Sequence, residues 1–166
     1  TPIFARFIKK NIKSKNLICV SPDAGGIERT RGLAKKINVD LAIIDKRRPQ
    51  AGKSEVMNII GEVKNKDCII VDDIIDSGGT IVNAADALIK NGAKDVYVFI
   101  THAVLSGEAI NKIKKSKIKK LIITDSIDNS RRLKKVNKIH VLSIAQLMAE
   151  AIKRISNSTS VSDLFN

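Results

Sequence analysis

The chain has 166 residues, 43% of them apolar and 3% aromatic, and 30 Lys and Arg against 17 Asp and Glu give it a formal net charge of +13. This size suits a single domain with one aliphatic core, and no apolar run approaches the ~18 residues that would span a membrane. The charge favours anionic partners such as nucleotides, sugar phosphates or nucleic acid without choosing among them.

Apolar periodicity predicts alternating helices and strands along the chain. The expected helices cover 2–8, 27–37, 80–91, 108–115 and 144–155. The expected strands cover 17–21, 39–45, 56–63, 68–72, 96–101, 121–124 and 139–142. The segment 56–63 fits either type, and its β-branched residues and Gly61 favour a strand.

This alternation indicates right-handed crossovers and an α/β fold, a doubly wound, mainly parallel sheet with helices on both faces. Ligands bind such sheets beyond the carboxyl ends of the strands. The loops that begin at Pro22, Lys46, Asp73 and Asp125 are therefore the first candidates for a functional site.

The two cysteines lie inside apolar runs, which is typical of small core residues. Neither Cys19 nor Cys68 suggests a disulfide framework, which fits a reducing cytoplasm. No signal peptide is visible, and because the chain begins with Thr1 rather than Met we expect a missing upstream segment.

The strongest candidate site follows the predicted strand 68–72. The adjacent carboxylates of Asp72 and Asp73, expected at the strand end, suit the vicinal hydroxyls of a sugar. The next residues combine hydroxyl donors, flexible backbone and the N–H groups of a helix entrance, which together can hold a phosphate. These phosphate-binding candidates are Asp76, Ser77, Gly78, Gly79 and Thr80. A glycine pair alone would indicate only a turn.

The whole segment from Val71 to Thr80 resembles the phosphoribosyl pyrophosphate motif of the type I phosphoribosyltransferase superfamily. The segment Ser21 to Gly26 resembles the diphosphate loop of the ribose-phosphate pyrophosphokinase family within it. That loop is an ordinary turn if it is considered alone. The resemblance extends over essentially the whole chain.

The diphosphate loop is expected to use backbone N–H groups at Gly25 and Gly26, with Asp23 on a ribose hydroxyl or a magnesium-bound water. The family resemblance assigns Asp23, Ala24, Gly25 and Gly26 to this loop. Most family members have His where this chain has Ala24, so one side-chain contact is in doubt while the backbone donors remain.

The basic segment Lys46-Arg47-Arg48-Pro49 resembles the flexible catalytic loop of the same family. By resemblance, Lys46 and Arg48 stabilise the charge that develops during phosphoryl-type transfer. Without the family, such a short basic run indicates a solvated loop. His102 lies near a strand end, and we expect it to be structural rather than a general base.

The resemblance implies a magnesium-dependent reaction of ribose 5-phosphate with ATP that yields phosphoribosyl pyrophosphate and AMP. It makes residues 1–166 the carboxyl-terminal half of a two-domain enzyme, with the ATP-holding residues in an absent upstream domain. Residues 143–158 would then pack against that domain. The family commonly forms homo-oligomers, namely hexamers built from dimers.

The terminal segment resembles part of a regulatory phosphate and ADP site through Ser160, Ser162 and Phe165. A disordered terminus is the alternative.

Two other functions remain open. A plain type I phosphoribosyltransferase would share the acidic motif but not the Lys-Arg-Arg-Pro loop. A non-catalytic regulatory or RNA-binding protein would use the +13 charge. The lysine-rich surface is more typical of a solvated face than of a nucleic-acid site, and stacking aromatic residues are scarce.

Overall fold

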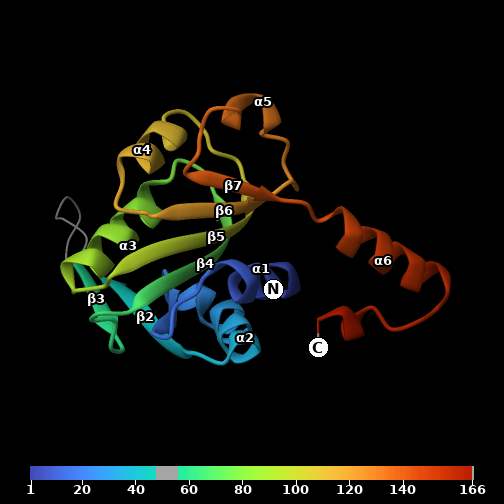
Figure 1. Cartoon of the computed structure of the whole chain (residues 1–166), viewed down its shortest axis with the longest axis horizontal. Helices are drawn as coiled ribbons and strands as arrows, with labels where there is room; N and C mark the ends of the chain where they lie inside the picture. The colour runs from blue at the N-terminus through green and yellow to red at the C-terminus, as the bar shows by residue number, and fades with distance from the viewer. Residues whose placement is uncertain (48–55, 166) are drawn as a thin grey trace.

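The structure of the chain is a computed structural model that describes residues 1–47 and 56–165 (Figure 1). Within these residues, seven strands form one sheet in the order β3-β2-β1-β4-β5-β6-β7. The strands are β1 (Leu17–Ser21), β2 (Asp40–Arg47), β3 (Val56–Ile60), β4 (Asp67–Ile75), β5 (Asp95–Ala103), β6 (Lys120–Thr124) and β7 (Ile139–Leu142).

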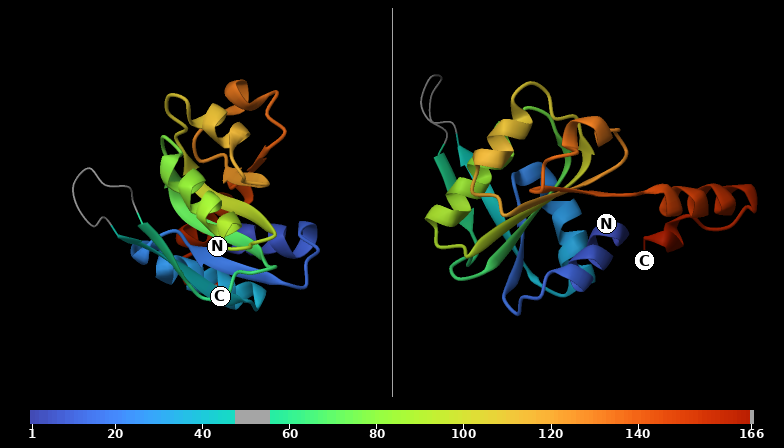
Figure 2. Two further views of the ribbon diagram at one scale, coloured as in Figure 1. Left: turned by 90° about the vertical axis from the view of Figure 1, so that its left-hand side faces the viewer. Right: turned by 45° about the horizontal axis from the view of Figure 1, so that its top comes forward.

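All neighbouring strands pair in parallel except β2 and β3, which pair antiparallel. Helices cover both faces of this sheet (Figures 1 and 2). The helices α1 (Pro2–Asn11) and α2 (Ile27–Ile37) pack on one face, and α3 (Gly79–Lys90) and α4 (Ala109–Lys115) pack on the other. The predicted doubly wound, mainly parallel fold is confirmed.

The two cores use alternate side chains of the same strands, because successive side chains of a strand point to opposite faces. Ile70 packs with the α3 and α4 layer, whereas Ile69 packs with α1 and α2. Both cysteines are fully buried, as predicted. Burial raises the pKa of the Cys19 and Cys68 thiols to about 12.

Two predicted boundaries in the edge strands β2 and β3 are wrong. The strand β2 includes Lys46 and Arg47, where a loop was expected, because these residues pair with Met57 and Val56 of β3. The ambiguous segment 56–63 does form a strand, but the strand ends at Ile60, directly before Gly61, whose φ is +115°. A Cβ on Gly61 would lie 2.9 Å from the Ala42 Cβ.

The chain after β7 leaves the sheet. The helix α6 (Ala145–Ser156) extends away from the body, and the short helix η2 (Ser162–Leu164) lies on the returning segment (Figures 1 and 2). We call residues 145–164 the C-terminal arm. Within the described ranges, no helix is both long and apolar enough to cross a bilayer.

Candidate functional site

A cavity of about 460 Å³ opens at the carboxyl ends of β1 and β4. This volume is in the range of small-molecule sites. Most of the predicted sugar, phosphate and diphosphate residues contribute to its wall, namely Asp23, Gly25, Asp72, Asp73, Asp76, Ser77, Gly78, Gly79 and Thr80. The fold thus brings together two loops that are about fifty residues apart in the sequence.

The acidic pair does not end its strand, contrary to expectation. The strand β4 continues to Ile75, because Ile74 and Ile75 still pair with His102 and Ala103 of the long strand β5. The Asp72 side chain is 15% exposed and that of Asp73 is 56% exposed. The pair therefore lies on a rigid strand, and Asp73 faces the cavity more openly.

Arg29 of α2 binds both carboxylates, and the sequence pattern did not predict it. Its Nη1 donates to Asp72 Oδ1, and its Nη2 donates to Asp73 Oδ2 at 2.8 Å. The Asp73 backbone N–H also donates to Asp72 Oδ1, at 2.9 Å. Burial raises the pKa of Asp72, and this N–H and the Arg29 charge act against that rise.

The phosphate-binding candidates lie where the loop enters α3. Gly78 has a φ of +77°, a conformation that favours glycine. It caps α3 without a side-chain hydrogen bond, and the first N–H groups of a helix have no partner within the helix. A Cβ on Gly79 would have no atom within 4 Å, so this helix end faces open space. The arrangement can accept an anion.

The diphosphate candidates form a short helix, η1 (Ala24–Gly26), directly before α2. Asp23 Oδ1 accepts a hydrogen bond from the Gly26 N–H at 3.0 Å, and Ser21 Oγ donates to the Asp23 carbonyl at 2.7 Å. The Gly26 donor is therefore already used, and it could bind a diphosphate only if Asp23 released it. Gly25 lines the cavity.

A close approach explains the glycine at position 26. A Cβ on Gly26 would lie 2.9 Å from Ser21 Oγ, which is too close for an unshifted side chain. Thr30 then fixes the start of α2 to this loop, because its Oγ1 donates to the Gly26 carbonyl at 2.8 Å and its side chain is buried. This hydrogen bond thus connects the loop that presents Asp23 and Gly25 to the helix that carries Arg29.

The predicted catalytic cations are not both placed by the structure. Lys46 lies on β2 opposite Met57 and is half-buried. The described residues that line the cavity do not include it. Arg48 lies outside the described residues. The catalytic assignment of both residues stays a prediction.

His102, a further candidate, lies on β5 outside the residues that line the cavity. The Nδ1 atom of His102 lies 3.0 Å from Ser126 Oγ, which in turn donates to the Thr101 carbonyl at 2.8 Å. This chain of contacts joins β5 to the loop after β6 and supports a structural role for His102. A metal-binding cluster of three or more His, Cys, Asp or Glu side chains is not found where the structure describes the chain.

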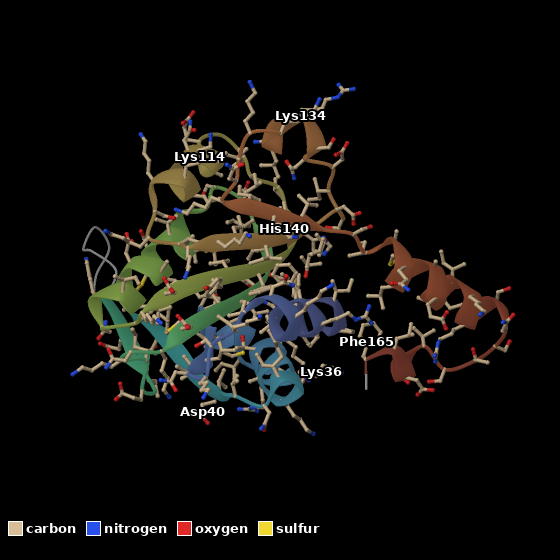
Figure 3. The ribbon with its side chains drawn as sticks, viewed as in Figure 1. Lys36, Asp40, Lys114, Lys134, His140 and Phe165 are labelled. Atoms are coloured by element: carbon tan, nitrogen blue, oxygen red, sulfur yellow. The ribbon has the colours of Figure 1, made fainter. Side chains whose placement is uncertain are left out.

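The predicted regulatory residues lie on the C-terminal arm and directly after it. Ser160 Oγ lies 2.9 Å from Ser162 Oγ and donates to Asp163 Oδ1 at 3.0 Å, and Arg154 Nη1 donates to the Ser160 carbonyl at 2.7 Å. Phe165 is 49% exposed and lies beside α2, near Lys36 (Figure 3). These hydrogen bonds join residues of the arm to one another, and the regulatory assignment of Ser160, Ser162 and Phe165 stays a prediction.

Known proteins resemble this chain in sequence and in fold. Residues 47–166 match the phosphoribosyl synthetase-associated domain. A ribose-phosphate pyrophosphokinase of Rhizobium meliloti (strain 1021) is 53% identical over 165 residues, which are 99% of this chain and 53% of that protein. The chain therefore spans about half the length of the curated relatives that it matches.

Solved structures agree with this similarity. The crystal structure of phosphoribosylpyrophosphate synthetase from Mycobacterium smegmatis has a TM-score of 0.84 at 33% identity, over 93% of this chain and 50% of that one. The adenine phosphoribosyl transferase of Trypanosoma brucei shares the fold, with a TM-score of 0.55 at 17% identity, over 86% of this chain and 62% of that one.

Proposed function

The chain belongs to the phosphoribosyl synthetase-associated domain family, and from that premise we propose that it is the sugar-phosphate-binding half of a ribose-phosphate pyrophosphokinase. The complete enzyme would transfer the β,γ-diphosphate of ATP to the 1-hydroxyl of ribose 5-phosphate and release AMP. The observation that carries this proposal is the shared cavity, in which Asp23 and Gly25 of one loop meet the wall from Asp72 to Thr80.

The sugar is assigned to the acidic pair and its phosphate to the start of α3. Carboxylate oxygens of Asp72 and Asp73 accept hydrogen bonds from the ribose hydroxyls. The 5-phosphate binds the loop from Asp76 to Thr80, where Gly78 and Gly79 leave space and backbone donors. The two assignments suit the two ends of one ligand.

The diphosphate is assigned to the loop from Asp23 to Gly26, at the other side of the cavity. Magnesium is expected to be held mainly by phosphate oxygens and water, as its preference for retained waters suggests, with Asp23 on a magnesium-bound water. The carboxylate and hydroxyl oxygens among the side chains of this cavity are ligands of the kind that magnesium prefers.

The transfer step is assigned to cations that close over the reactants. A diphosphate acquires charge on its oxygens as it moves, and Lys46 and Arg48 would stabilise that charge. Lys46 lies one residue before the end of β2.

The remaining parts of the enzyme are proposed from the same family. An upstream domain would supply the ATP-holding residues and would pack against residues 143–158, and homo-oligomers built from dimers would complete the assembly in the cytoplasm. The pattern of Ser160, Ser162 and Phe165 would contribute to a regulatory phosphate or ADP site between subunits.

Calorimetry with ribose 5-phosphate tests the binding half of this proposal. The chain should bind this ligand, and Asp73→Asn should weaken binding about tenfold or more, because a charged acceptor is lost. Asp40→Asn is the matched control, since Asp40 is 84% exposed at the amino end of β2, away from the cavity. Equal weakening by both variants, or no binding at all, would contradict the proposal.

Product analysis tests the reaction. The complete polypeptide should release AMP from ATP and ribose 5-phosphate, and Lys46→Ala should lower its turnover far more than its sugar binding. Consumption of phosphoribosyl pyrophosphate with a free base and release of pyrophosphate would instead identify a plain phosphoribosyltransferase.

A further inference from the structure

Arg29 joins the two loops of the cavity. It lies in the first turn of α2, directly after the loop that holds Gly25 and Gly26, and it reaches Asp72 and Asp73, which are 43 and 44 residues further along the chain. The same guanidinium also lines the cavity itself. One side chain thus fixes the acidic pair relative to the diphosphate loop.

The charge of this contact matters for the ligand. Two adjacent carboxylates repel each other and also repel a phosphorylated sugar or a diphosphate. One guanidinium offsets half of their charge. A second cavity of about 190 Å³ adjoins the three side chains, and its wall includes Arg29, Asp72 and Asp73. The Arg29 side chain is 34% exposed and that of Asp73 is 56% exposed, so solvent partly screens this contact.

The contact leaves acceptor atoms for a ligand. Arg29 and the Asp73 N–H use Asp72 Oδ1, and Arg29 uses Asp73 Oδ2. The other oxygen of each carboxylate takes no part in these bonds. A guanidinium holds planar acceptors in a fixed orientation, whereas an ammonium group acts as a point charge.

From these contacts we propose that Arg29 is a positioning residue for the sugar subsite, which keeps Asp72 and Asp73 oriented so that their second oxygens receive the ribose hydroxyls of an anionic sugar phosphate. The inference rests on the proposed function, since it takes the acidic pair to be the sugar subsite. It adds a residue from α2 that acts through the two carboxylates.

The experiment compares Arg29→Ala and Arg29→Lys with Arg31→Ala, an exposed arginine of the same helix. The affinity for ribose 5-phosphate is measured by calorimetry, and circular dichroism checks folding. Arg29→Ala should weaken binding about tenfold or more, because an oriented charge-assisted contact is lost. Arg29→Lys should restore part of the affinity, and Arg31→Ala should change nothing.

A pH series separates positioning from mere structural support. Without Arg29 the pKa of Asp72 should be higher, so affinity should be lost at a higher pH on acidification than in the unsubstituted chain. Asp23 and Asp76 line the same cavity and are present in every variant, so the comparison isolates Arg29. Inorganic phosphate, which feels the lost charge but makes no contact with oriented carboxylates, should lose less affinity for Arg29→Ala than ribose 5-phosphate does.

The failures are distinguishable. If the unsubstituted chain does not bind ribose 5-phosphate, the proposed function fails. If it binds and both Arg29 variants bind equally well with the same pH profile, the positioning role alone is contradicted. Tighter binding by Arg29→Ala would show that Arg29 occupies the sugar subsite. Should Arg29→Ala not fold, Arg29→Lys carries the same comparison.

Discussion

The ligand cavity and the C-terminal arm differ in what supports them. Behind the cavity, strands such as β4 contribute residues that are fully buried in the two cores. The helix α6 has no buried residue, and its Met148, Ile152 and Ile155 are 49%, 63% and 67% exposed. Apolar periodicity predicted the elements of both regions, but only those behind the cavity are buried within the described chain.

Polar contacts hold the arm instead. Arg154 Nε lies 3.0 Å from Glu150 Oε1, and Arg154 Nη1 binds the Ser160 carbonyl. Exposed ion pairs of this kind contribute little to stability. The arm should therefore contribute little to the free energy of unfolding, while the strands behind the cavity should dominate it.

Phe99→Ala should give the largest effect. Phe99 is fully buried on β5, and its ring lies 5.3 Å from that of Phe4. Removing a buried aromatic side chain leaves a cavity and should lower the free energy of unfolding by about 3–5 kcal/mol. Urea denaturation followed by circular dichroism measures this loss. A change below about 1 kcal/mol would contradict the expectation that the sheet, and not the arm, dominates the free energy of unfolding.

Alanine substitutions of the two glycines at the start of α3 should differ in their effects on stability and on ligand binding. Gly78→Ala places a Cβ at a φ of +77° and should cost about 1–2 kcal/mol of stability. Gly79→Ala meets no atom within 4 Å, so stability should be kept while the added methyl reduces ribose 5-phosphate affinity. Thermal unfolding and calorimetry on both variants test this, and equal stability losses would contradict it.

Asp125→Ala should loosen only the attachment of the arm. Asp125 Oδ1 accepts the Ile144 N–H at 2.8 Å, and hydrogen bonds from Ser143 and Ile144 lower the pKa of this carboxyl. Because that pKa is lowered on folding, the contact is present above about pH 4 and is lost as the pH falls through the folded value.

Hydrogen exchange measures this local effect. The protection factors of amides near Ile144, which correct for the slower intrinsic exchange in acid, should fall in Asp125→Ala and on acidification, whereas amides of β4 should keep their protection. Faster exchange throughout β4 would mean that the arm and the sheet unfold together.

Ile152→Ala should give the smallest effect. This side chain is 63% exposed in the arm, so its truncation should change the free energy of unfolding of the chain by less than about 0.5 kcal/mol. A loss above 1 kcal/mol, about the size of a buried methylene, would show that the arm packs on the chain or on a second copy in solution. Urea denaturation of Ile152→Ala and Phe99→Ala under the same conditions compares the two losses of unfolding free energy directly.

Local patterns predicted most of the fold. Strands such as β1 and β4 are continuous apolar runs, and the glycines after them mark the helix entrances. The carboxyl end of β4 was placed too early, because the polar pair Asp72 and Asp73 resembles a strand end. Only pairing with β5 extends the strand to Ile75.

Long-range contacts were the main part that the sequence did not reveal. Arg29 lies among other basic residues of α2, and its carboxylate partners are more than forty residues away. The short helix α5 (Ser130–Leu133) was also missed, since four residues carry no helical period. The loops that bear the motif residues were predictable because those residues are contiguous in the chain.

The buried cysteines give the sheet a built-in chemical reporter. Cys19 and Cys68 lie on adjacent strands, with side chains in different cores, and both thiols have a pKa near 12. Since the thiolate is the reactive form, a maleimide or iodoacetamide should modify neither residue until the strands separate. The rate of alkylation therefore follows opening of β1 and β4, and fraying of α6 should leave that rate unchanged.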